Sequence, residues 1–206
     1  MTTITRHDVL NTLTALMNTA DLAMLKTSDP SFRDHLSNEG KLLAQIQRQI
    51  EFTHDYETLG KGAPVWHDLQ LVVENNARQV LPKTIAVETD LRGTLLFADP
   101  LFEKVIYNLM DNAVRHGGTV TRIRFSVRDA DGGLCLTCAD DGEGIPDHEK
   151  SRIFERGYGK NTGLGLFLVR EILGITGFTI QETGVQGKGA QFEIVVPDGM
   201  YRTANT

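Results

Sequence analysis

The sequence predicts an α+β fold in which an N-terminal helical hairpin precedes a mixed sheet with helices on one face. Up to residue 60, apolar residues recur in steps of three and four, the spacing of amphipathic helices. Beyond that point helical and alternating patterns are interleaved. Glycine and proline become frequent there, after occurring once each before residue 60, at Gly40 and Pro30. This change divides the chain into a hairpin domain at 1–60 and a second domain at 66–200.

Two helices are expected in the hairpin, over residues 4–26 and 31–58. The apolar stripe of the first comprises Leu10, Leu13, Met17, Ala20 and Met24. The stripe of the second includes Leu36, Leu43, Ile46 and Ile50. Two helices alone have too little area to bury both stripes, so we expect two copies of the hairpin to form a dimeric four-helix bundle. Packing of the hairpin against the rest of its own chain is the alternative.

After a glycine- and proline-containing linker at 59–64, helical and strand patterns alternate. Helices are expected over residues 67–81, 100–115 and 165–176. Strands are expected over 85–89, 94–97, 121–128, 134–139, 179–182 and 191–196. This order of elements implies helices laid on one face of a mixed sheet.

Composition and charge exclude several classes of protein. With 206 residues, 40% apolar and 23% charged, the chain is typical of globular proteins rather than disordered ones. A net charge of −6 does not give the even basic surface of a nucleic-acid binder, so we expect no nucleic-acid partner. We see no apolar run long enough to cross a bilayer and no signal-peptide pattern, which leads us to expect a cytoplasmic chain without a membrane segment.

The two cysteines, Cys135 and Cys138, have the C-x-x-C spacing of some redox and zinc sites. They fall within an expected buried strand, where side chains three apart point to opposite faces. We therefore interpret them as core residues, in agreement with a reducing compartment.

Two segments of the second domain have residue types suited to a nucleotide. Asn108 and Asn112 lie four apart on one helix, so their amide oxygens project side by side and could help to hold Mg²⁺. Asp140, Gly142 and Gly144 directly follow a strand. A carboxylate there can accept a hydrogen bond from an adenine amino group, while the glycines let the backbone approach the base closely.

Two further segments are suited to phosphate. Gly163, Leu164, Gly165 and Leu166 open a helix, whose free N–H groups favour an anion such as triphosphate. Before them, Arg156 and Lys160 lie in a glycine-containing basic loop that could close over phosphates. Taken singly, each of these segments is also compatible with an ordinary surface turn or a closely packed helix start.

In this order and spacing the segments, with the glycine turn at 187–189, resemble the catalytic ATP-binding domain of sensor histidine kinases, a fold shared with gyrase, Hsp90 and MutL. The resemblance covers residues 66–197 and implies an α/β sandwich that binds ATP and Mg²⁺. It implies a lid at 155–162 and Asn112 as the metal ligand. It also places Arg115 and His116 near the phosphates.

One position separates kinases from ATPases within that fold. The ATP-hydrolysing relatives carry a glutamate four residues before the magnesium-binding asparagine, and this chain has Asn108 there. An amide does not take a proton from water at neutral pH, so we expect the γ-phosphoryl group to be left for another nucleophile.

His7 in the hairpin is the candidate nucleophile, because it lies beside the apolar stripe rather than within it. With Asp8 and Asn11 it resembles the H box of the histidine kinase dimerisation and phosphotransfer domain. A neutral imidazole with a pKa near ~6.5 is a competent nucleophile, and a carboxylate on Nδ1–H would make Nε2 the attacking atom. Asp8 is the candidate for that role, and Asn11 resembles the residue that orients water in phosphatase reactions. The other histidines that we interpret as surface residues are His35, His54, His67 and His148.

Together these features predict an ATP-dependent homodimeric histidine kinase. The resemblance implies that the phosphoryl group passes from His7 to an aspartate of a response-regulator receiver domain, and it allows phosphatase activity toward that partner. Three alternatives stay open. They are a nucleotide-binding anti-sigma-type serine kinase, a conformational ATPase and a non-catalytic phosphorelay or scaffold dimer.

Overall fold

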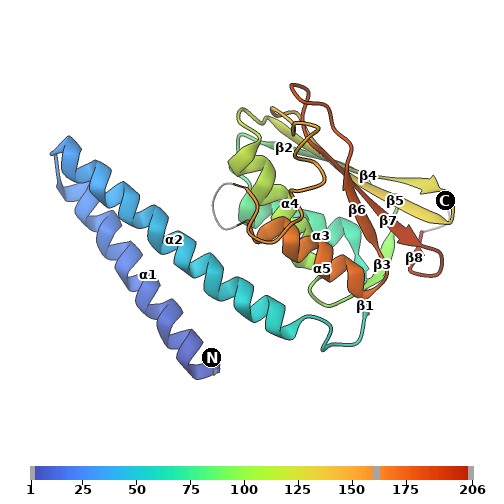
Figure 1. The fold of residues 1–206 in the computed structure, drawn as a ribbon, viewed down its shortest axis with the longest axis horizontal. Coiled ribbons are helices and arrows are strands. Elements are labelled where there is room, and N and C mark those ends of the chain that lie inside the picture. The colour runs from blue at the N-terminus through green and yellow to red at the C-terminus, as the bar shows by residue number, and fades with distance from the viewer. Residues whose placement is uncertain (1–2, 160–162, 204–206) are drawn as a thin grey trace. The chain divides into compact units, whose positions relative to one another are not determined.

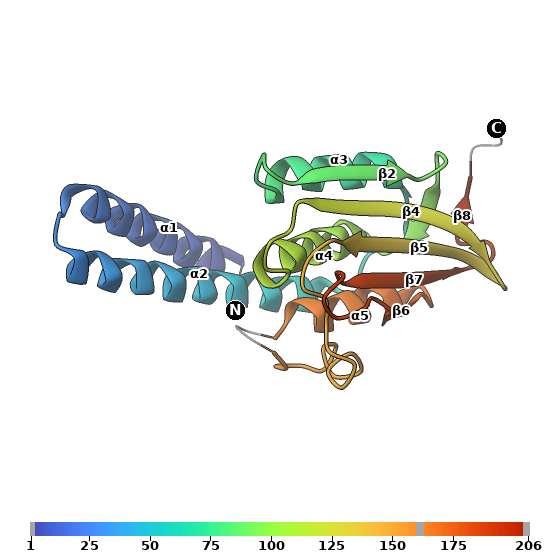
Figure 2. The same cartoon turned by 90° about the horizontal axis from the view of Figure 1, so that it is seen from above.

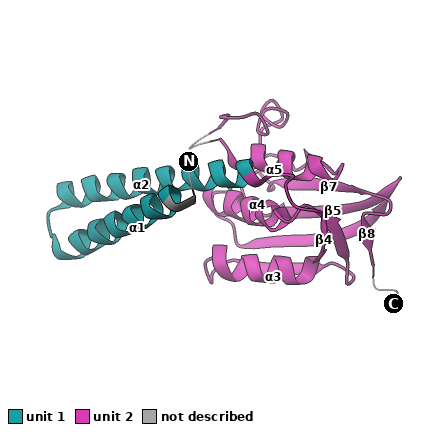
Figure 3. Ribbon diagram, turned by 90° about the horizontal axis from the view of Figure 1, so that it is seen from below, with its two compact units in different colours: residues 1–57, 160–162 teal, residues 58–159, 163–206 magenta. Residues whose placement is uncertain are grey.

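The computed structural model describes residues 3–159 and 163–203, which form two compact units (Figure 3). Unit 1 extends to Glu57 and unit 2 begins at Thr58. Lys160, one of the residues expected to contact phosphate, lies outside the described residues. None of the described helices is both long enough and apolar enough to span a membrane.

Unit 1 is a hairpin of two helices, α1 (Thr3–Lys26) and α2 (Pro30–Thr58) (Figure 1). The helix boundaries match the sequence prediction to within one residue. Leu13 and Ala20 from the α1 stripe are buried, as is Leu36 of α2, so the two stripes pack together as expected. The Asp29 carboxylate accepts a hydrogen bond from the Ser31 amide at 2.9 Å and caps the start of α2.

Unit 2 contains two sheets. The smaller is antiparallel and has the order β1-β3-β8, with β1 at Val65–Asp68, β3 at Leu95–Ala98 and β8 at Tyr201–Arg202. The larger has the order β2-β4-β5-β7-β6. Its strands are β2 (Ala86–Asp90), β4 (Arg122–Ala130), β5 (Gly133–Asp140), β6 (Thr179–Glu182) and β7 (Gln191–Pro197). Only the β2–β4 pair among these described strands is parallel, so the larger sheet is mixed, as predicted.

Three helices cover one face of the larger sheet: α3 (Leu69–Val80), α4 (Phe102–His116) and α5 (Gly165–Ile175). The strands lie in front of these helices in Figure 2 and behind them in Figure 3, which is drawn from the opposite side. Alternate residues of β4 point toward the helices and are buried, as the alternation in the sequence predicted. The helices and the mixed sheet confirm the predicted α+β fold.

The sequence prediction missed β1 and β8. The helix expected from residue 67 begins instead at Leu69, because the Asp68 carboxylate accepts a hydrogen bond from the Leu71 amide at 3.1 Å and caps it. The interpretation of His67 as a surface residue is wrong. Strand β1 turns this side chain inward, where Nε2 lies 3.1 Å from the Asp99 carbonyl oxygen and the ring packs against Phe102.

The interpretation of the cysteines as core residues is confirmed. Cys135 and Cys138 are both buried and unpaired in β5. Burial raises the pKa of the Cys138 thiol, which keeps it protonated and unreactive. Among the described residues, no group of three or more histidine, cysteine, aspartate or glutamate side chains is arranged to hold a metal ion.

Candidate active site

The carboxylate of Asp140, the last residue of β5, is held in a fixed orientation by two backbone amides. Its Oδ1 accepts hydrogen bonds from the amides of Gly142 at 2.9 Å and Ala190 at 3.1 Å. Burial raises the pKa of this carboxyl, and the two amide hydrogen bonds oppose that shift. Among the described residues none donates a hydrogen bond to Oδ2. The second oxygen is therefore available to an external donor.

The glycines after Asp140 allow three backbone segments to approach one another. A side chain at position 142 would collide with the carbonyl group of Gly117, where α4 ends, and the Glu143 amide donates to that carbonyl at 2.8 Å. Gly144 has φ +68°, and a side chain there would meet the Val185 carbonyl oxygen at 2.7 Å. Only glycine fits at these two positions, because it has no Cβ and tolerates a positive φ. This explains the glycines found two and four residues after Asp140 in the sequence.

The neighbouring Asp141 ties the same loop to the start of β4. Its carboxylate accepts hydrogen bonds from the Thr121 hydroxyl at 2.6 Å, the Thr121 amide at 2.9 Å and the Arg122 amide at 3.0 Å. The Thr121 hydroxyl is the largest cause that lowers the pKa of this carboxyl, to about 2. The two adjacent aspartates thus have different roles. Both carboxylate oxygens of Asp141 accept hydrogen bonds from within the protein, whereas Asp140 keeps Oδ2 open.

The depressed pKa of Asp141 predicts a pH-dependent contribution to stability. The contribution is complete above the ordinary pKa of 3.8 and is lost as the pH falls toward about 2, because the folded state holds the ionised form more tightly. We expect Asp141→Asn to unfold at lower denaturant concentration than the parent near neutral pH, with the difference narrowing in acid. Denaturant titrations at several pH values measure this. A difference independent of pH would contradict the assignment.

Helices α4 and α5 meet at Asn108. Its amide nitrogen donates to the Lys104 carbonyl at 2.7 Å. Its Oδ1 would lie 2.9 Å from a Cβ at position 165, so a larger residue at the start of α5 would displace the Asn108 side chain. Among the described residues no side chain caps the first turn of α5, which follows Leu164. The N–H groups of Gly165 and Leu166 in that turn therefore remain available to an anion. Asn112 lies one turn beyond Asn108 and is half-buried.

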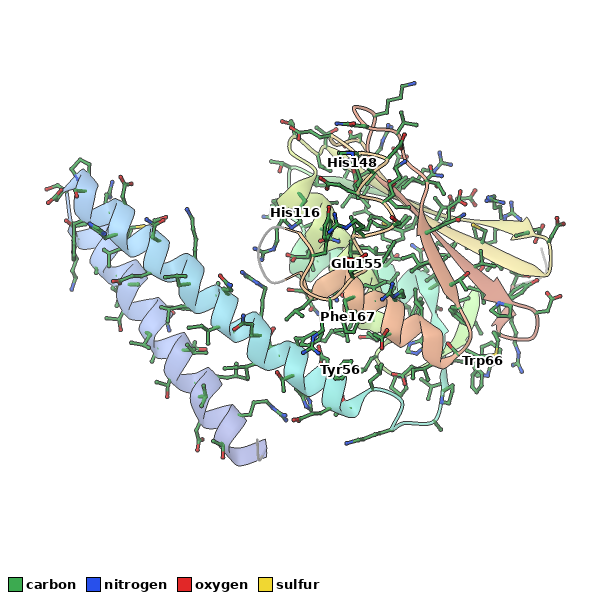
Figure 4. The ribbon with its side chains drawn as sticks, in the orientation of Figure 1. Tyr56, Trp66, His116, His148, Glu155 and Phe167 are labelled. Carbon is green, nitrogen blue, oxygen red and sulfur yellow. The ribbon has the colours of Figure 1, made fainter. Side chains whose placement is uncertain are left out.

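The basic residues expected near the phosphates have different surroundings in the structure. The Arg115 Nε donates to both carboxylate oxygens of Asp111, at 2.6 and 2.7 Å, so its guanidinium is engaged within α4. His116 is the last residue of α4 (Figure 4). Arg156 is exposed in the segment before α5. The Asp111 carboxylate thus occupies Nε of Arg115, and the two Nη groups are the donors that could reach a phosphate.

In unit 1, His7 is exposed on α1, with 74% of its side chain accessible. The Asn11 amide nitrogen lies 3.2 Å from His7 Nδ1, whereas the nearest Asp8 carboxylate oxygen is 3.6 Å away. The contact with Asn11 is short enough for a hydrogen bond, and the contact with Asp8 is too long for one. The same amide nitrogen lies 3.5 Å from Nε2, so Asn11 faces the ring edge between the two nitrogens. The expected contact between Asp8 and Nδ1–H is therefore not formed in this conformation.

Sequence reasoning missed the backbone groups that orient Asp140. The Ala190 amide comes from the connection between β6 and β7, fifty positions from the aspartate. A backbone amide can belong to any residue type, so the sequence does not identify it as a donor. The one local signal is the glycine at position 189. That residue has φ +117°, and a side chain there would collide with the Asp140 carbonyl group.

Comparison with known proteins agrees with this geometry. Residues 98–200 match the family described as histidine kinase-, DNA gyrase B-, and HSP90-like ATPase. The sensor protein KdpD of Escherichia coli (strain K12) is 27% identical over 212 residues, covering 93% of this chain and 23% of that protein. The sensor kinase CckA of Brucella abortus (strain 2308) is 31% identical over 222 residues, with the same coverage of both chains. The chain thus spans about a quarter of the length of these relatives.

Among solved structures, the crystal structure of full-length ShkA in complex with AMPPNP has the same fold. The TM-score is 0.68 at 20% identity, and the match covers 98% of this chain and 46% of ShkA. The motifs in the sequence, the geometry around Asp140 and the family match over residues 98–200 lead to one conclusion. The chain belongs to the histidine kinase-, DNA gyrase B- and HSP90-like ATPase family, and its resemblance to sensor histidine kinases is confirmed.

Proposed function

We propose that this chain is the catalytic core of a protein histidine kinase, with residues 1–60 as the dimerisation and phosphotransfer domain and 66–200 as the ATP-binding domain. The observation that carries the proposal is the Asp140 carboxylate, which two backbone amides orient while its Oδ2 stays open. An oriented acceptor with a free oxygen suits the amino group of adenine. The uncapped first turn of α5 suits the phosphates of the same nucleotide.

The remaining nucleotide contacts follow from the positions of the other motif residues. Gly163, Gly165 and the backbone of Leu164 and Leu166 receive the triphosphate at the start of α5. Gly142 and Gly144 let the loop lie close to the base. Further charge comes from the basic residues Arg115, His116, Arg156 and Lys160.

A magnesium ion is implied by the family, and the donor chemistry of α4 fits it. Asn112, with Asn108 one turn before it, offers neutral amide oxygens, and Mg²⁺ prefers oxygen ligands shared among protein, water and phosphate. We assign Asn112 as the protein ligand. When bound, the ion offsets charge on the phosphates of ATP.

The phosphoryl group is transferred to His7 Nε2. A bond forms between Nε2 and the γ-phosphorus while the bond from that phosphorus to the bridging oxygen of ADP breaks, giving ADP and phosphohistidine. The attack needs the lone pair on Nε2, so the ring must hold its proton on Nδ1. Asp8 accepts that proton in a hydrogen bond once its oxygen closes the 3.6 Å gap and Asn11 releases Nδ1.

Hydrolysis of ATP by water is disfavoured at the same site. The family position that would carry a base holds Asn108, whose amide nitrogen is bonded to the Lys104 carbonyl. Since no carboxylate stands there to activate water, the phosphohistidine is the main product. From it the phosphoryl group passes to an aspartate of a response-regulator receiver domain in the cytoplasm.

The proposal is tested by incubating the protein with γ-labelled ATP and magnesium. Phosphohistidine is labile in acid and stable in alkali, so we expect label with that stability on the chain itself. Label stable in acid, or label transferred only to serine of an added protein, would instead identify the serine-kinase alternative. Failure to bind ATP would leave a scaffold role and contradict the proposal.

We also propose that the hairpin forms a homodimer through an apolar groove of about 380 Å³ between its helices. The groove is lined by Leu16, Thr19, Ala20, Ala23, Leu36, Glu39, Leu42 and Leu43. Leu16 and Leu42 are 50% and 60% exposed in a single copy. Such side chains are stabilised when a second hairpin covers them in a four-helix bundle.

This dimer predicts the effect of Leu16→Glu. We expect the dimer dissociation constant to rise by about a hundredfold or more, since a symmetric dimer loses two buried leucines, each worth about 1.5–3 kcal/mol. Sedimentation equilibrium measures the constant. Asn18→Glu is the matched control, because it adds the same charge at an exposed position of α1 outside the groove. An unchanged dimer in Leu16→Glu would place the interface elsewhere.

A further inference from the structure

Glu182, at the end of β6, is a buried carboxylate outside the motifs that the sequence analysis singled out. Its side chain has no exposed surface. Oε1 accepts hydrogen bonds from the amides of Gly184 at 3.0 Å and Gln191 at 3.1 Å. These bonds fasten the two ends of the connection between β6 and β7 to each other.

Lys150 joins this carboxylate to the loop that follows Asp140. Its Nζ lies 3.3 Å from Glu182 Oε2 and donates to the Gly184 carbonyl at 2.6 Å. A third contact, at 3.0 Å, is to the exposed carboxylate of Asp147 in its own loop. Only 19% of the lysine side chain is accessible, so the pair with Glu182 is shielded from water.

The segment fastened in this way also orients Asp140. The Ala190 amide, one residue from Gln191, donates to Asp140 Oδ1, and the Gly187 amide donates to the Glu143 carbonyl at 2.6 Å. A shift of the β6–β7 connection would therefore move the donors that aim the Asp140 carboxylate. Glu182 fixes this connection from within, and Lys150 fixes it to the Asp140 loop.

A buried ion pair is a costly way to gain stability, because desolvation of the two charges offsets most of their attraction. Apolar side chains of similar volume would hold the segments together at least as well. What the charged pair adds is placement. The Lys150 ammonium donates to the Gly184 carbonyl, while its charge attracts Glu182 Oε2, which accepts no hydrogen bond from the described residues. The chemistry of the pair therefore favours a role in precise placement over a role in stability alone.

We propose that Lys150 and Glu182 are positioning residues that set the preference of this site for adenine over bases without an exocyclic amino group. They act through Ala190 on Asp140 and do not touch the nucleotide. The inference rests on the proposed binding of ATP at Asp140. It goes beyond that proposal because it assigns base selectivity to an ion pair outside the binding motifs.

Glu182→Gln is the sharpest test. Glutamine keeps the shape and an oxygen for the Gly184 and Gln191 amides, but it turns an –NH₂ group toward the Lys150 ammonium. We expect the dissociation constant for ATP to rise by about tenfold, because the charge-assisted hydrogen bond between Asp140 and the adenine amino group is lost. The constant for inosine triphosphate, which has a carbonyl in place of the amino group, should change less than about twofold, because no Asp140 hydrogen bond is lost. Isothermal titration calorimetry on the full chain measures both.

Two further variants complete the test. Lys150→Arg keeps a cation and is expected to retain most of the preference for ATP, while Lys150→Met is expected to lose it. Arg128→Met is the matched control, since it breaks the Arg128–Glu193 pair, also 3.3 Å long, away from the Asp140 loop. Circular dichroism confirms that each variant is folded at the temperature of the titration.

The outcomes separate the two proposals. A parent that binds both nucleotides equally would overturn adenine recognition by Asp140, and this inference with it. A parent that prefers ATP, with variants that lose affinity for both nucleotides in equal proportion, would show that the pair is merely structural. Unchanged preference in folded Glu182→Gln would likewise overturn the inference. Convergence of the two affinities in Glu182→Gln and Lys150→Met, but not in Arg128→Met, supports it.

Discussion

Replacing His7 with alanine is expected to reduce the acid-labile label taken from γ-labelled ATP to background. His7 is highly exposed on α1 and has both Asp8 and Asn11 within reach of Nδ1. Removal of the imidazole removes the only atom to which the proposed reaction attaches phosphorus, so the loss should be complete rather than partial. The measurement is label retained after alkali and lost after acid, with nucleotide binding titrated in parallel.

The matched control for this result is His35→Ala. His35 is also an exposed histidine of unit 1, carried by α2 rather than α1. We expect it to retain the label of the parent. ATP affinity should be the same in both variants, because neither histidine belongs to the nucleotide site. Equal label on the His7 and His35 variants would remove His7 from the proposal and leave ATP binding intact.

The second large effect is expected from Asp140→Asn. Asparagine can keep its oxygen on the Gly142 and Ala190 amides, which places an –NH₂ donor where Oδ2 stood. A donor would then face the amino group of adenine, leaving both without a partner. We expect ATP affinity to fall by about a hundredfold or more, the cost of two unsatisfied polar groups in a shielded site. Label on His7 falls with it at limiting ATP.

Asp129→Asn serves as the control for charge. This aspartate also lies in the larger sheet, at the far end of β4, and 87% of its side chain is accessible. The variant has the same net charge as Asp140→Asn, and we expect parental ATP affinity. Calorimetric titration with ATP measures the dissociation constant of both variants. Parental affinity in folded Asp140→Asn would show that the base lies elsewhere.

Much of the fold follows from local patterns in the sequence. The stripes of α1 and α2 are long enough to define both helices and the face by which they pack, and Leu13, Ala20 and Leu36 are buried as that pattern requires. The alternation in β4 likewise predicted which of its residues face the helices. The glycine motif after Asp140 was readable because the backbone approaches at positions 142 and 144 exclude any Cβ.

The parts that were missed depend on contacts distant in sequence. Strand β8 has two residues and exists because it pairs with β3, and the Arg202 guanidinium lies 4.1 Å from the centre of the Trp66 ring. His67 is buried because β1 pairs with β3. The Ala190 amide and the Lys150–Glu182 pair depend on tertiary proximity of segments that no local pattern connects.

The protected thiols of β5 have a practical consequence. Because Cys135 and Cys138 are buried and burial raises the pKa of both, alkylating reagents should spare them in the native protein. One cysteine introduced on the surface of each unit could then carry a fluorophore or spin label without prior removal of the native sulfur atoms. Distances between probes in the two units become measurable on an otherwise unaltered chain.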